Sequence, residues 1–416
     1  MSKTMPNVVV IGCGFGGLTA AKALARQPVR LTLIDRRNHH LFQPLLYQVA
    51  TAGLSPADIA MPIRAVFRGQ SNTRVLLGAV TSIDLAAHEV NLSGHHIGYD
   101  TLIVATGARH AYFGHDGWEP FAPGLKQVED ALDIRRRVLL ALERAEVLDD
   151  PNERRRLLTF AIVGAGPTGV ELAGAIAELA KVALAMDFRS IDPREARVLL
   201  IEAGERVLPS FPTSLSARAV GALHTLGVEV LTGTAVTECN AEGVTLGNRK
   251  IPTATVLWAA GVMASPAAAW LGAAQDRAGR VIVQPDLTLP GHPEIFVVGD
   301  TAAVAGPDGK PLPGLAPVAK QQGAYVARAV RARLSGRGIE PFHYRNLGSL
   351  ATIGRGRAVA DFGWLRLNGS LAWLLWGLVH VAFLIGFRNR IVVLLEWLWS
   401  YVTFKRGARL ITGPTQ

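Results

Sequence analysis

Two clusters of glycine have the spacing that lets a polypeptide backbone approach the phosphates of a dinucleotide. The first follows the β-branched run 8–11 and leads into a helical stretch, and it reads Gly12-Cys13-Gly14-Phe15-Gly16-Gly17. In such a cluster the first glycine permits a tight turn, the second lets the backbone approach a pyrophosphate, and the last permits close packing of helix against strand. The positive end of the helix faces the phosphate charge. We therefore predict a dinucleotide site at this cluster.

An acidic residue at the end of the next expected strand, 31–34, completes this pattern. Asp35 lies 21 residues after Gly14, where a carboxylate can bind the hydroxyl pair of a ribose. Arg36 follows it directly and is assigned to the same site. A glycine turn in an unrelated α/β domain is the alternative. We favour the nucleotide site because strand, helix and acid are all in register.

The same pattern recurs about one domain further along the chain. After the apolar run 160–163, the second cluster reads Gly164-Ala165-Gly166-Pro167-Thr168-Gly169. Its strand-end acid is Glu202, which lies 38 residues after Gly164, and an insertion around 186–195 would explain the longer spacing. A carboxylate there favours a free 2′-hydroxyl and therefore NADH over NADPH, whereas the nearby Arg206 could accommodate a 2′-phosphate. The residues predicted to bind NADH are Gly164, Gly166, Thr168, Gly169, Glu202 and Gly261.

Two dinucleotide clusters in one chain indicate a redox pair. A nicotinamide carries a hydride, and a flavin can accept it and release electrons singly or in pairs. Two further strand ends fit a flavin site, the pair Thr106-Gly107 and the pair Gly299-Asp300. The second pair would place the Asp300 carboxylate and a helix start beside the ribityl–pyrophosphate region of the flavin. The alternative is that Asp300 only caps the following helix. We predict FAD at the first cluster and NADH at the second.

Composition limits the possible classes of protein. Among 416 residues, 49% are hydrophobic and the mean hydropathy is +0.25, which falls short of a polytopic membrane protein and indicates one apolar region. Only two cysteines, Cys13 and Cys239, are present, so a disulfide framework and a CxxC redox pair are excluded. No signal-peptide pattern precedes the first strand. We predict a reducing, cytoplasmic location.

The formal net charge of +10 could indicate nucleic acid, anionic lipid or an acidic cofactor as a partner. Two arginine runs, 135–137 and 154–156, stand beside acidic residues in helical segments, so we interpret them as solvated faces. The sequence has no zinc spacing and no nucleic-acid module. The pair His39-His40 has no carboxylate spaced for a metal, and a loop near the flavin is the better interpretation. We predict no metal and no nucleic-acid partner.

The C-terminal part of the chain, from 371 to 404, is mostly apolar and rich in tryptophan. As a helix its first piece, 371–387, would be about 25 Å long, shorter than the hydrocarbon core of about 30 Å. Basic residues follow both apolar pieces, at 388–390 and 405–406. We predict that these helices lie in an anionic membrane surface. A single tilted span and a helix hairpin buried at a homodimer interface are the alternatives. The tryptophans expected at the membrane interface are Trp373, Trp376, Trp397 and Trp399.

Taken together, these motifs resemble the pyridine-nucleotide disulfide oxidoreductase superfamily and, within it, the type II NADH dehydrogenases. The superfamily resemblance covers residues 7 to about 330 and rests on both glycine clusters and on the strand ends at 105–107 and 299–300. The narrower resemblance rests on segments that are specific only in combination, namely 40–50, 164–174, 316–323 and 350–355. It implies a single-subunit enzyme of the respiratory chain that passes electrons from NADH through FAD to a membrane quinone without pumping protons.

The resemblance also implies roles for individual residues. Glu171 stands where the family has a glutamate at the nicotinamide–flavin junction, implicated in charge transfer and proton supply. Its simpler interpretation is a first-turn glutamate favoured by the helix dipole. The family's quinone-side motif, AQxAxQ, corresponds to Ala316-Pro317-Val318-Ala319-Lys320-Gln321. Gln321 and Lys320 are assigned to catalysis, and the quinone side is assigned to Ala316, Pro317, Ala319 and Gln321.

Two sequence features bear on where electrons leave the flavin. No cysteine pair follows the first cluster, which disfavours an outlet through a disulfide or sulfide. Pro317 replaces the first glutamine of the quinone-side motif, although proline is tolerated in the first turn of a helix. Because that glutamine is missing, two alternatives stay open. One is an NADH oxidase or diaphorase with a soluble acceptor, and the other is a non-catalytic redox sensor that holds NADH and flavin.

The predicted fold class is α/β, with two Rossmann-like dinucleotide-binding domains and C-terminal membrane-associating helices. The NADH domain is nested within the FAD domain. The predicted segments are 1–120 and 266–335 for the FAD domain, 121–265 for the NADH domain and 336–416 for the membrane-anchoring region. The protein would then lie on the cytoplasmic face of the cell membrane as a monotopic enzyme.

Overall fold

The structure of the protein is a computed structural model that describes residues 5–306, 309–403 and 406–413. The residues group into two compact units. The segments of the first unit are Met1–Leu41, Ala60–Arg109 and Val262–Asn346. The segments of the second unit are Phe42–Ile59, His110–Gly261 and Leu347–Gln416. The division at 120, 265 and 335 stays a prediction, and the C-terminal region belongs to the second unit.

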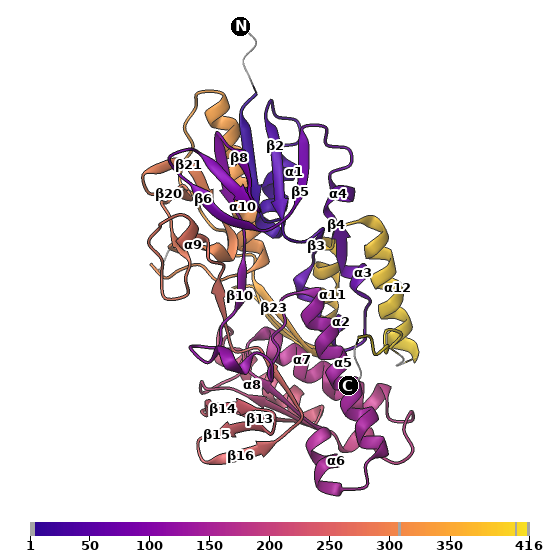
Figure 1. Ribbon diagram of the computed structural model, residues 1–416. Coiled ribbons are helices and arrows are strands. Elements are labelled where there is room, and N and C mark those ends of the chain that lie inside the picture. The colour runs from indigo at the N-terminus through magenta and orange to yellow at the C-terminus, as the bar shows by residue number, and fades with distance from the viewer. Residues whose placement is uncertain (1–4, 307–308, 404–405, 414–416) are drawn as a thin grey trace. The chain divides into compact units, whose positions relative to one another are not determined.

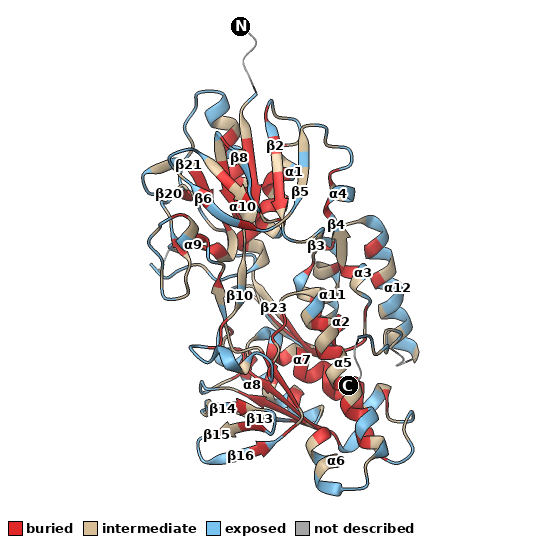
Figure 2. Ribbon diagram, in the orientation of Figure 1, coloured by how far each residue is buried: buried red, intermediate tan, exposed pale blue. Residues whose placement is uncertain are grey.

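The first unit is built on a six-stranded sheet with the order β20-β21-β9-β1-β2-β5 (Figure 1). Its strands pair in parallel except at β20, which pairs antiparallel with β21. The aliphatic residues of β1 and β9 are buried (Figure 2), as in a parallel sheet covered on both faces. The strand bounds are β1 (Asn7–Ile11), β2 (Arg30–Asp35), β5 (Thr73–Leu77), β9 (Thr101–Val104), β20 (Thr288–Leu289) and β21 (His292–Val297).

Two helices of the first unit pack against each other through glycine. They are α1 (Phe15–Ala23), which begins within the first glycine cluster, and α10 (Ala316–Leu334). A Cβ atom on Gly323 would lie 2.2 Å from the backbone oxygen of Gly16, so only glycine permits this approach. The remaining elements are β3 (His39–Leu41), β4 (Ala60–Pro62), α4 (Ile63–Val66), β6 (Val80–Asp84), β7 (Glu89–Leu92), β8 (His95–Gly98), β18 (Val262–Ala264), α9 (Ala267–Trp270), β19 (Val281–Ile282) and β22 (Ala302–Ala303).

The second unit repeats the same design around a four-stranded parallel sheet with the order β13-β12-β11-β17. The bounds are β11 (Thr159–Val163), α7 (Pro167–Glu178), β12 (Arg197–Ile201), β13 (Val228–Leu231) and β17 (Thr255–Trp258). A π-helical turn at Leu179–Ala183 and a 3-10 turn at Pro193–Glu195 lie between α7 and β12, and the insertion around 186–195 stays a prediction. The two Rossmann-like domains predicted from the glycine clusters are therefore confirmed.

The C-terminal segment adds a small antiparallel sheet and two helices to the second unit. A Cβ atom on Gly174 of α7 would lie 1.6 Å from the backbone oxygen of Ile353, so α7 packs tightly against this sheet. The C-terminal elements are β23 (Ser349–Gly354), β24 (Arg357–Asp361), β25 (Arg366–Asn368), α11 (Gly369–Phe383) and α12 (Phe387–Thr403). The other elements are α2 (Leu46–Ala50), α3 (Pro56–Ile59), α5 (Val128–Val147), α6 (Pro151–Leu157), α8 (Thr213–Thr225), β14 (Val236–Asn240), β15 (Gly243–Leu246) and β16 (Arg249–Pro252).

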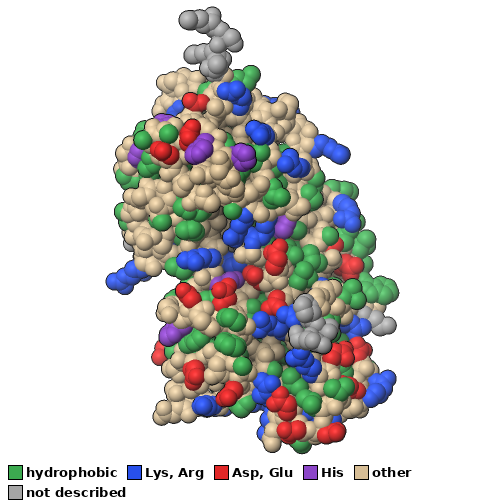
Figure 3. Space-filling model, viewed as in Figure 1, with side chains coloured by type: hydrophobic (Ala, Val, Ile, Leu, Met, Phe, Trp, Pro, Cys, Tyr) green, Lys and Arg blue, Asp and Glu red, His purple; other side chains and the backbone are tan. Residues whose placement is uncertain are grey.

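Helices α11 and α12 are apolar on their exposed sides as well as on their packed sides. Leu378 is 69% exposed and Leu398 is 62% exposed, and Figure 3 shows hydrophobic side chains along the outer edge of α12. Trp376, by contrast, is only 2% exposed. The prediction that Trp376 lies at a membrane interface is therefore wrong, because its ring fills the interior of the second unit. Within the described parts of the chain, no helix combines the length and apolarity needed to cross a membrane.

Candidate functional site

The first glycine cluster forms an open turn between β1 and α1. Gly12 has a φ of +96°, and a Cβ atom there would lie 2.4 Å from the backbone oxygen of Ala105. A Cβ atom on Gly17 would lie 1.9 Å from the oxygen of Gly12, whereas one on Gly14 would meet no protein atom within 4 Å. Gly12 and Gly17 therefore hold the turn together, and Gly14 leaves its outer side open to a phosphate.

Asp35 and the first cluster are directly joined, as the sequence pattern predicted. The Asp35 carboxylate accepts hydrogen bonds from the backbone N–H of Cys13 at 2.6 Å and from that of Arg37 at 2.8 Å. Phe15 begins α1, and Arg36 is exposed beside the carboxylate. The acid thus fixes the phosphate-binding turn, and its placement on a ribose stays a prediction.

The two other strand ends of the first unit meet through a hydroxyl cluster that the sequence did not reveal. Thr106 Oγ1 lies 2.6 Å from Ser265 Oγ, and the buried Thr301 accepts a hydrogen bond from the N–H of Gly107 at 2.8 Å. Ser265 and Thr301 both lie more than 150 positions after Thr106-Gly107, so no local motif joins the two ends. Gly107 and Gly299 both have a φ of +72°, which lets the backbone turn away at the ends of β9 and β21.

The environment of Asp300 agrees with one of the two interpretations offered by the sequence and excludes the other. Asp300 lies inside a 3-10 turn, Gly299–Thr301, and the next helix, α10, begins only at Ala316. The N-cap of α10 is Leu315, so the alternative in which Asp300 itself caps that helix is wrong. A Cβ atom on the preceding Gly314 would lie 3.0 Å from Oδ1 of Asp300, so the start of α10 lies beside the carboxylate, as predicted. The turn is held by Gln322 of α10, a buried side chain whose Oε1 accepts from the N–H of Gly299 at 2.6 Å.

His40 provides a test of whether these residues fit FAD. Its Nδ1 lies 2.7 Å from the carbonyl oxygen of Cys13, which requires a proton on Nδ1. Burial lowers the pKa of His40 to about 4, so the ring is neutral. Its buried Nε2 is an acceptor that meets no hydrogen-bond partner among the described residues. A flavin beside Cys13 brings the hydroxyl donors of its ribityl chain, so the open turn and this acceptor fit FAD.

The second glycine cluster has the same arrangement as the first. Gly164 has a φ of +99°, and a Cβ atom on Gly169 would lie 1.8 Å from the Gly164 oxygen. A Cβ atom on Gly166 would meet no protein atom within 4 Å. The Glu202 carboxylate accepts from the N–H of Ala165 at 2.7 Å and from that of Gly204 at 2.8 Å. This arrangement fits the pyrophosphate of NADH at the start of α7.

Three further residues bear on the NADH site. Thr168 is the second residue of α7 and is exposed. Gly261 follows β17, and its carbonyl accepts from the N–H of Ala111 at 3.2 Å. Arg206 donates to the carbonyl oxygens of Phe211 at 2.8 Å and Pro209 at 2.7 Å. Its guanidinium is therefore engaged by its own loop, which weakens the NADPH alternative.

A cavity of about 280 Å³ lies within the second unit beside α7. Three of the four C-terminal tryptophans line it, together with Tyr47 and Gln48 of α2. The sequence segment 40–50 carried the resemblance, but nothing in it predicted this cavity. Its charged lining residues are Glu171, Glu178, Arg355, Arg357 and Arg406, and its aromatic ones are Tyr47, Trp373, Trp376, Trp397 and Tyr401.

Glu171 is the most perturbed carboxyl group of this cavity. It lies in the second turn of α7, which begins at Pro167, so the interpretation as a first-turn glutamate favoured by the dipole is wrong. Burial raises the pKa of Glu171 from its ordinary 4.5 to about 8, although a backbone hydrogen bond with Thr352 works against this rise. Near neutral pH the side chain is therefore mostly a neutral acid that carries a proton.

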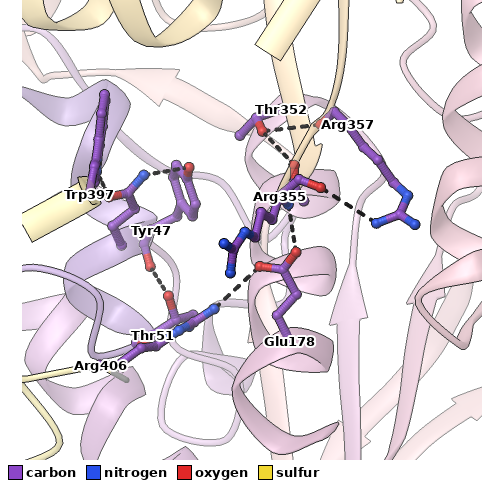
Figure 4. A network of polar contacts seen from close by, with 10 residues as sticks. Tyr47, Thr51, Glu178, Thr352, Arg355, Arg357, Trp397 and Arg406 are labelled. Carbon is purple, nitrogen blue, oxygen red and sulfur yellow. Dashed lines mark hydrogen bonds and ion pairs between the residues drawn. The ribbon is translucent and has the colours of Figure 1, made fainter. Parts of the chain in front are cut away.

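A largely buried ion pair ties Arg406, near the end of the chain, to the cavity wall. Figure 4 shows Glu178 between the arginines, where it accepts from the N–H of Arg355 at 2.6 Å and faces Nη2 of Arg406 at 3.5 Å. Arg406 also donates to the carbonyl oxygen of Thr51 at 2.7 Å. Arg406 was predicted to anchor the chain on lipid, and this part of the prediction is wrong because its side chain is only 12% exposed. Lys405 lies outside the described residues.

Replacing Arg406 with Met is expected to lower the free energy of unfolding by about 3 kcal/mol, because it leaves a buried carboxylate without its partner. Denaturant unfolding followed by tryptophan fluorescence measures the loss. Arg409→Met is the matched control, since Arg409 pairs with the more exposed Asp187 and should cost less than about 1 kcal/mol. Equal losses in the two variants would contradict the role assigned to Arg406.

The quinone-side motif lies on α10 in the first unit. Pro317 occupies the first turn of α10, as predicted. The side-chain amide of Gln321 makes two hydrogen bonds with the backbone of Arg345. Its Nε2 donates to the carbonyl oxygen at 2.9 Å, and its Oε1 accepts from the N–H at 3.0 Å. Lys320, Ala316 and Ala319 lie on the same helix turn, and the charge of Lys320 contributes to the lowered pKa of His40. A quinone contact by Gln321 stays a prediction.

The chain is similar to known flavin-dependent oxidoreductases over almost its whole length. The profile of the pyridine nucleotide-disulphide oxidoreductase family matches residues 6–323, and that of the NDH2 C-terminal domain matches residues 346–406. The type II NADH:quinone oxidoreductase Ndh of Mycobacterium tuberculosis is 49% identical over 98% of this chain and 90% of its own length. Its relative NdhA, from the same organism, is 48% identical over 98% and 89%.

A solved structure agrees with this result at the level of the fold. NDH2 from Plasmodium falciparum, solved in complex with NADH, superposes with a TM-score of 0.89 and 21% identity, covering 98% of this chain and all of that one. The predicted α/β fold class and the predicted family are both confirmed. The chain belongs to the pyridine nucleotide-disulphide oxidoreductase family, within its group of type II NADH:quinone oxidoreductases.

Proposed function

We propose that this chain oxidises NADH at the second glycine cluster, through FAD held at the first, and reduces a quinone beside the cavity of the second unit. Electron transfer from NADH to a quinone without proton pumping is the activity of the family to which the chain belongs. When bound, FAD supplies an electron acceptor that separates the oxidation of NADH from the reduction of the quinone. The observation that carries the residue-level proposal is the protonated Glu171 in a cavity with aromatic walls.

Each glycine cluster positions one dinucleotide in this scheme. Gly14 and Gly166 let the backbone approach the two pyrophosphates, and the N-termini of α1 and α7 favour their negative charge. Asp35 and Glu202 hold the two turns rigid through backbone N–H groups. The Glu202 carboxylate also repels a 2′-phosphate, which supports NADH as the reductant.

Glu171 supplies a proton in the proposed reaction. A quinone takes up two protons with two electrons, and an acid whose pKa lies near the working pH transfers a proton efficiently. The buried Glu171 has such a pKa, at about 8. Gln321 and Lys320 are proposed to act on the quinone side from α10, with Pro317 leaving one contact of the family motif unmade.

Turnover with different acceptors tests the proposed function against its alternatives. The purified FAD-loaded protein is mixed with NADH and menadione, a soluble quinone, and separately with NADH and oxygen alone. We expect NADH consumption to require menadione. Oxygen-dependent consumption that menadione does not increase would indicate an NADH oxidase. A long-lived reduced flavin that neither acceptor discharges would indicate a redox sensor.

We further propose that α11 and α12 bind the cytoplasmic face of the cell membrane. Leu394, Leu395 and Leu398 of α12 are about half exposed or more, and the exposed Arg388 and Arg390 stand at the start of the same helix. A helix with an exposed apolar side and nearby basic residues binds anionic lipid surfaces. The membrane gives a quinone-reducing enzyme access to its lipid-soluble substrate.

Replacing Leu394, Leu395 and Leu398 together with Gln is expected to weaken binding to anionic vesicles by on the order of 100-fold, since each leucine loses roughly 1 kcal/mol of burial in lipid. Flotation with phosphatidylglycerol vesicles measures the effect. The control exchanges three exposed apolar residues elsewhere, Leu77, Val147 and Met186, and should bind as the wild type does. Unchanged binding of the α12 variant would exclude this helix as the anchor.

A further inference from the structure

A chain of hydrogen bonds runs from helix α12 to the buried phenol of Tyr47 in the second unit. The indole Nε1–H of Trp397 donates to Oε1 of Gln48 at 2.7 Å. The amide Nε2 of Gln48 in turn donates to the hydroxyl oxygen of Tyr47 at 2.8 Å. Figure 4 shows Trp397 beside Tyr47 in this network. All three residues line the cavity that contains Glu171.

The chemistry of these groups allows this series of hydrogen bonds only one direction. An indole N–H can only donate, so the oxygen of the Gln48 amide must face Trp397 and its NH₂ group must face Tyr47. The Tyr47 oxygen accepts from that NH₂ group, and its own proton must then point away from Gln48. Within the described part of the chain, no protein group accepts this proton.

Tyr47 is held firmly enough for this direction to matter. Its carbonyl oxygen accepts from Oγ1 of the buried Thr51 at 2.9 Å, and its ring centroid lies 6.4 Å from that of Trp376. Burial, together with the nearby Glu171 carboxyl, keeps the pKa of Tyr47 well above its usual range. The phenol therefore stays protonated near neutral pH, with its proton directed away from Gln48.

We infer that Tyr47 donates a hydrogen bond to a carbonyl oxygen of the quinone, and that Gln48 and Trp397 are positioning residues that aim this proton. A quinone carbonyl only accepts hydrogen bonds, so it complements a donor that has no other acceptor. The planar indoles of Trp373 and Trp376, which line the same cavity, suit a flat ring. The inference rests on the proposed function and adds a substrate contact to it. It also makes α12, which carries Trp397, part of the substrate site.

Steady-state kinetics of single and double variants test the inference on the full-length FAD-loaded protein with menadione. In Tyr47→Phe we expect kcat/KM for menadione to fall about 10-fold, as for one lost hydrogen bond to a group that gains charge. The KM for NADH and the rate with ferricyanide, which accepts electrons without a carbonyl, should not change. Trp397→Phe should lower kcat/KM about threefold. Trp364→Phe, which changes an exposed tryptophan of the same unit, should have no effect.

The double variant separates positioning from general damage. If Trp397 acts only through Tyr47, adding Trp397→Phe to Tyr47→Phe should lower kcat/KM no further. An additive loss would overturn the role of Trp397, and wild-type kcat/KM in Tyr47→Phe would overturn the inference as a whole. If Tyr47→Phe fails to hold FAD, Gln48→Leu removes the aiming bond instead and should lower kcat/KM about threefold, with an unchanged value overturning the inference. Failure of the wild type to reduce menadione would refute the proposed function itself.

Discussion

Replacing Glu171 with Gln is expected to slow menadione-dependent NADH oxidation by about 100-fold, because an amide cannot supply the proton that a positioned acid gives. The wild-type rate should fall as the pH rises through about 8, where burial has placed the pKa of Glu171. The variant should lack this dependence, since it has no carboxyl group to titrate. A pH series of kcat with both proteins measures the two effects together.

The same substitution is expected to stabilise the fold in alkali. The folded protein holds the Glu171 proton more tightly than the unfolded chain, since burial raises the pKa from 4.5 to about 8. This contribution to stability is complete below the lower value and is lost as the pH rises through the higher one. In alkali the folded wild type must bury the charged Glu171 carboxylate, which the glutamine variant lacks. The free energy of unfolding of the variant should then exceed that of the wild type by roughly 2 to 4 kcal/mol.

Melting temperatures measured across this pH range check the stability effect. The difference between variant and wild type should be small in acid and should grow as the pH passes from 4.5 to about 8. Glu143→Gln is the control, because Glu143 is an exposed residue of α5, and it should give a constant difference. A Glu171→Gln difference that does not vary with pH would show that the carboxyl group is not buried as described.

Replacing Gly169 with Ala is expected to destabilise the second unit by more than about 3 kcal/mol. The added methyl group would lie 1.8 Å from the backbone oxygen of Gly164, and neither backbone can move without disturbing β11 or α7. Gly166→Ala is the matched variant, because a Cβ atom there meets no protein atom within 4 Å. It should fold normally but weaken NADH binding by about 100-fold, since the methyl group would occupy the approach to the pyrophosphate.

Thermal unfolding and titration with NADH distinguish the two glycine variants. Gly169→Ala should lower the melting temperature, and Gly166→Ala should leave it unchanged while raising the dissociation constant of NADH. If Gly166→Ala bound NADH as tightly as the wild type, the second cluster would not be the NADH site. If Gly169→Ala had the same melting temperature as the wild type, the close approach of Gly169 to the Gly164 oxygen would be contradicted.

The nucleotide-binding turns could be predicted from the sequence because their determinants are local. Gly12, Gly14 and Gly17 stand within six positions, and strand, turn and helix follow in order. The strand-end acids lie further away, but β1 pairs with β2 and β11 with β12 in parallel register. That pairing brings each acid to its glycine cluster. Periodicity and turn chemistry were therefore sufficient for the two Rossmann-like domains.

The cavity could not be predicted because its residues come from segments that lie far apart in the sequence. Tyr47 lies on α2, Glu171 on α7 and Trp397 on α12. The apolar, tryptophan-rich composition of the C-terminal segment indicated a membrane-facing surface, but it did not show which tryptophans face inward. Trp376 and Arg406 were both assigned to the membrane surface, whereas Trp376 is buried and the Arg406 side chain is largely buried. Burial of a charged or aromatic residue is decided by partners distant in sequence, here Glu178 and Tyr47.

The central claim is that electrons pass from NADH through the flavin to a quinone, and the two half-reactions test it most directly. The FAD-loaded protein is mixed without oxygen with one equivalent of NADH, and the flavin absorbance is followed. Menadione is then added. We expect NADH to bleach the flavin and menadione to restore its colour rapidly, with one equivalent of quinol formed. A flavin that NADH bleaches but menadione does not reoxidise would contradict the account.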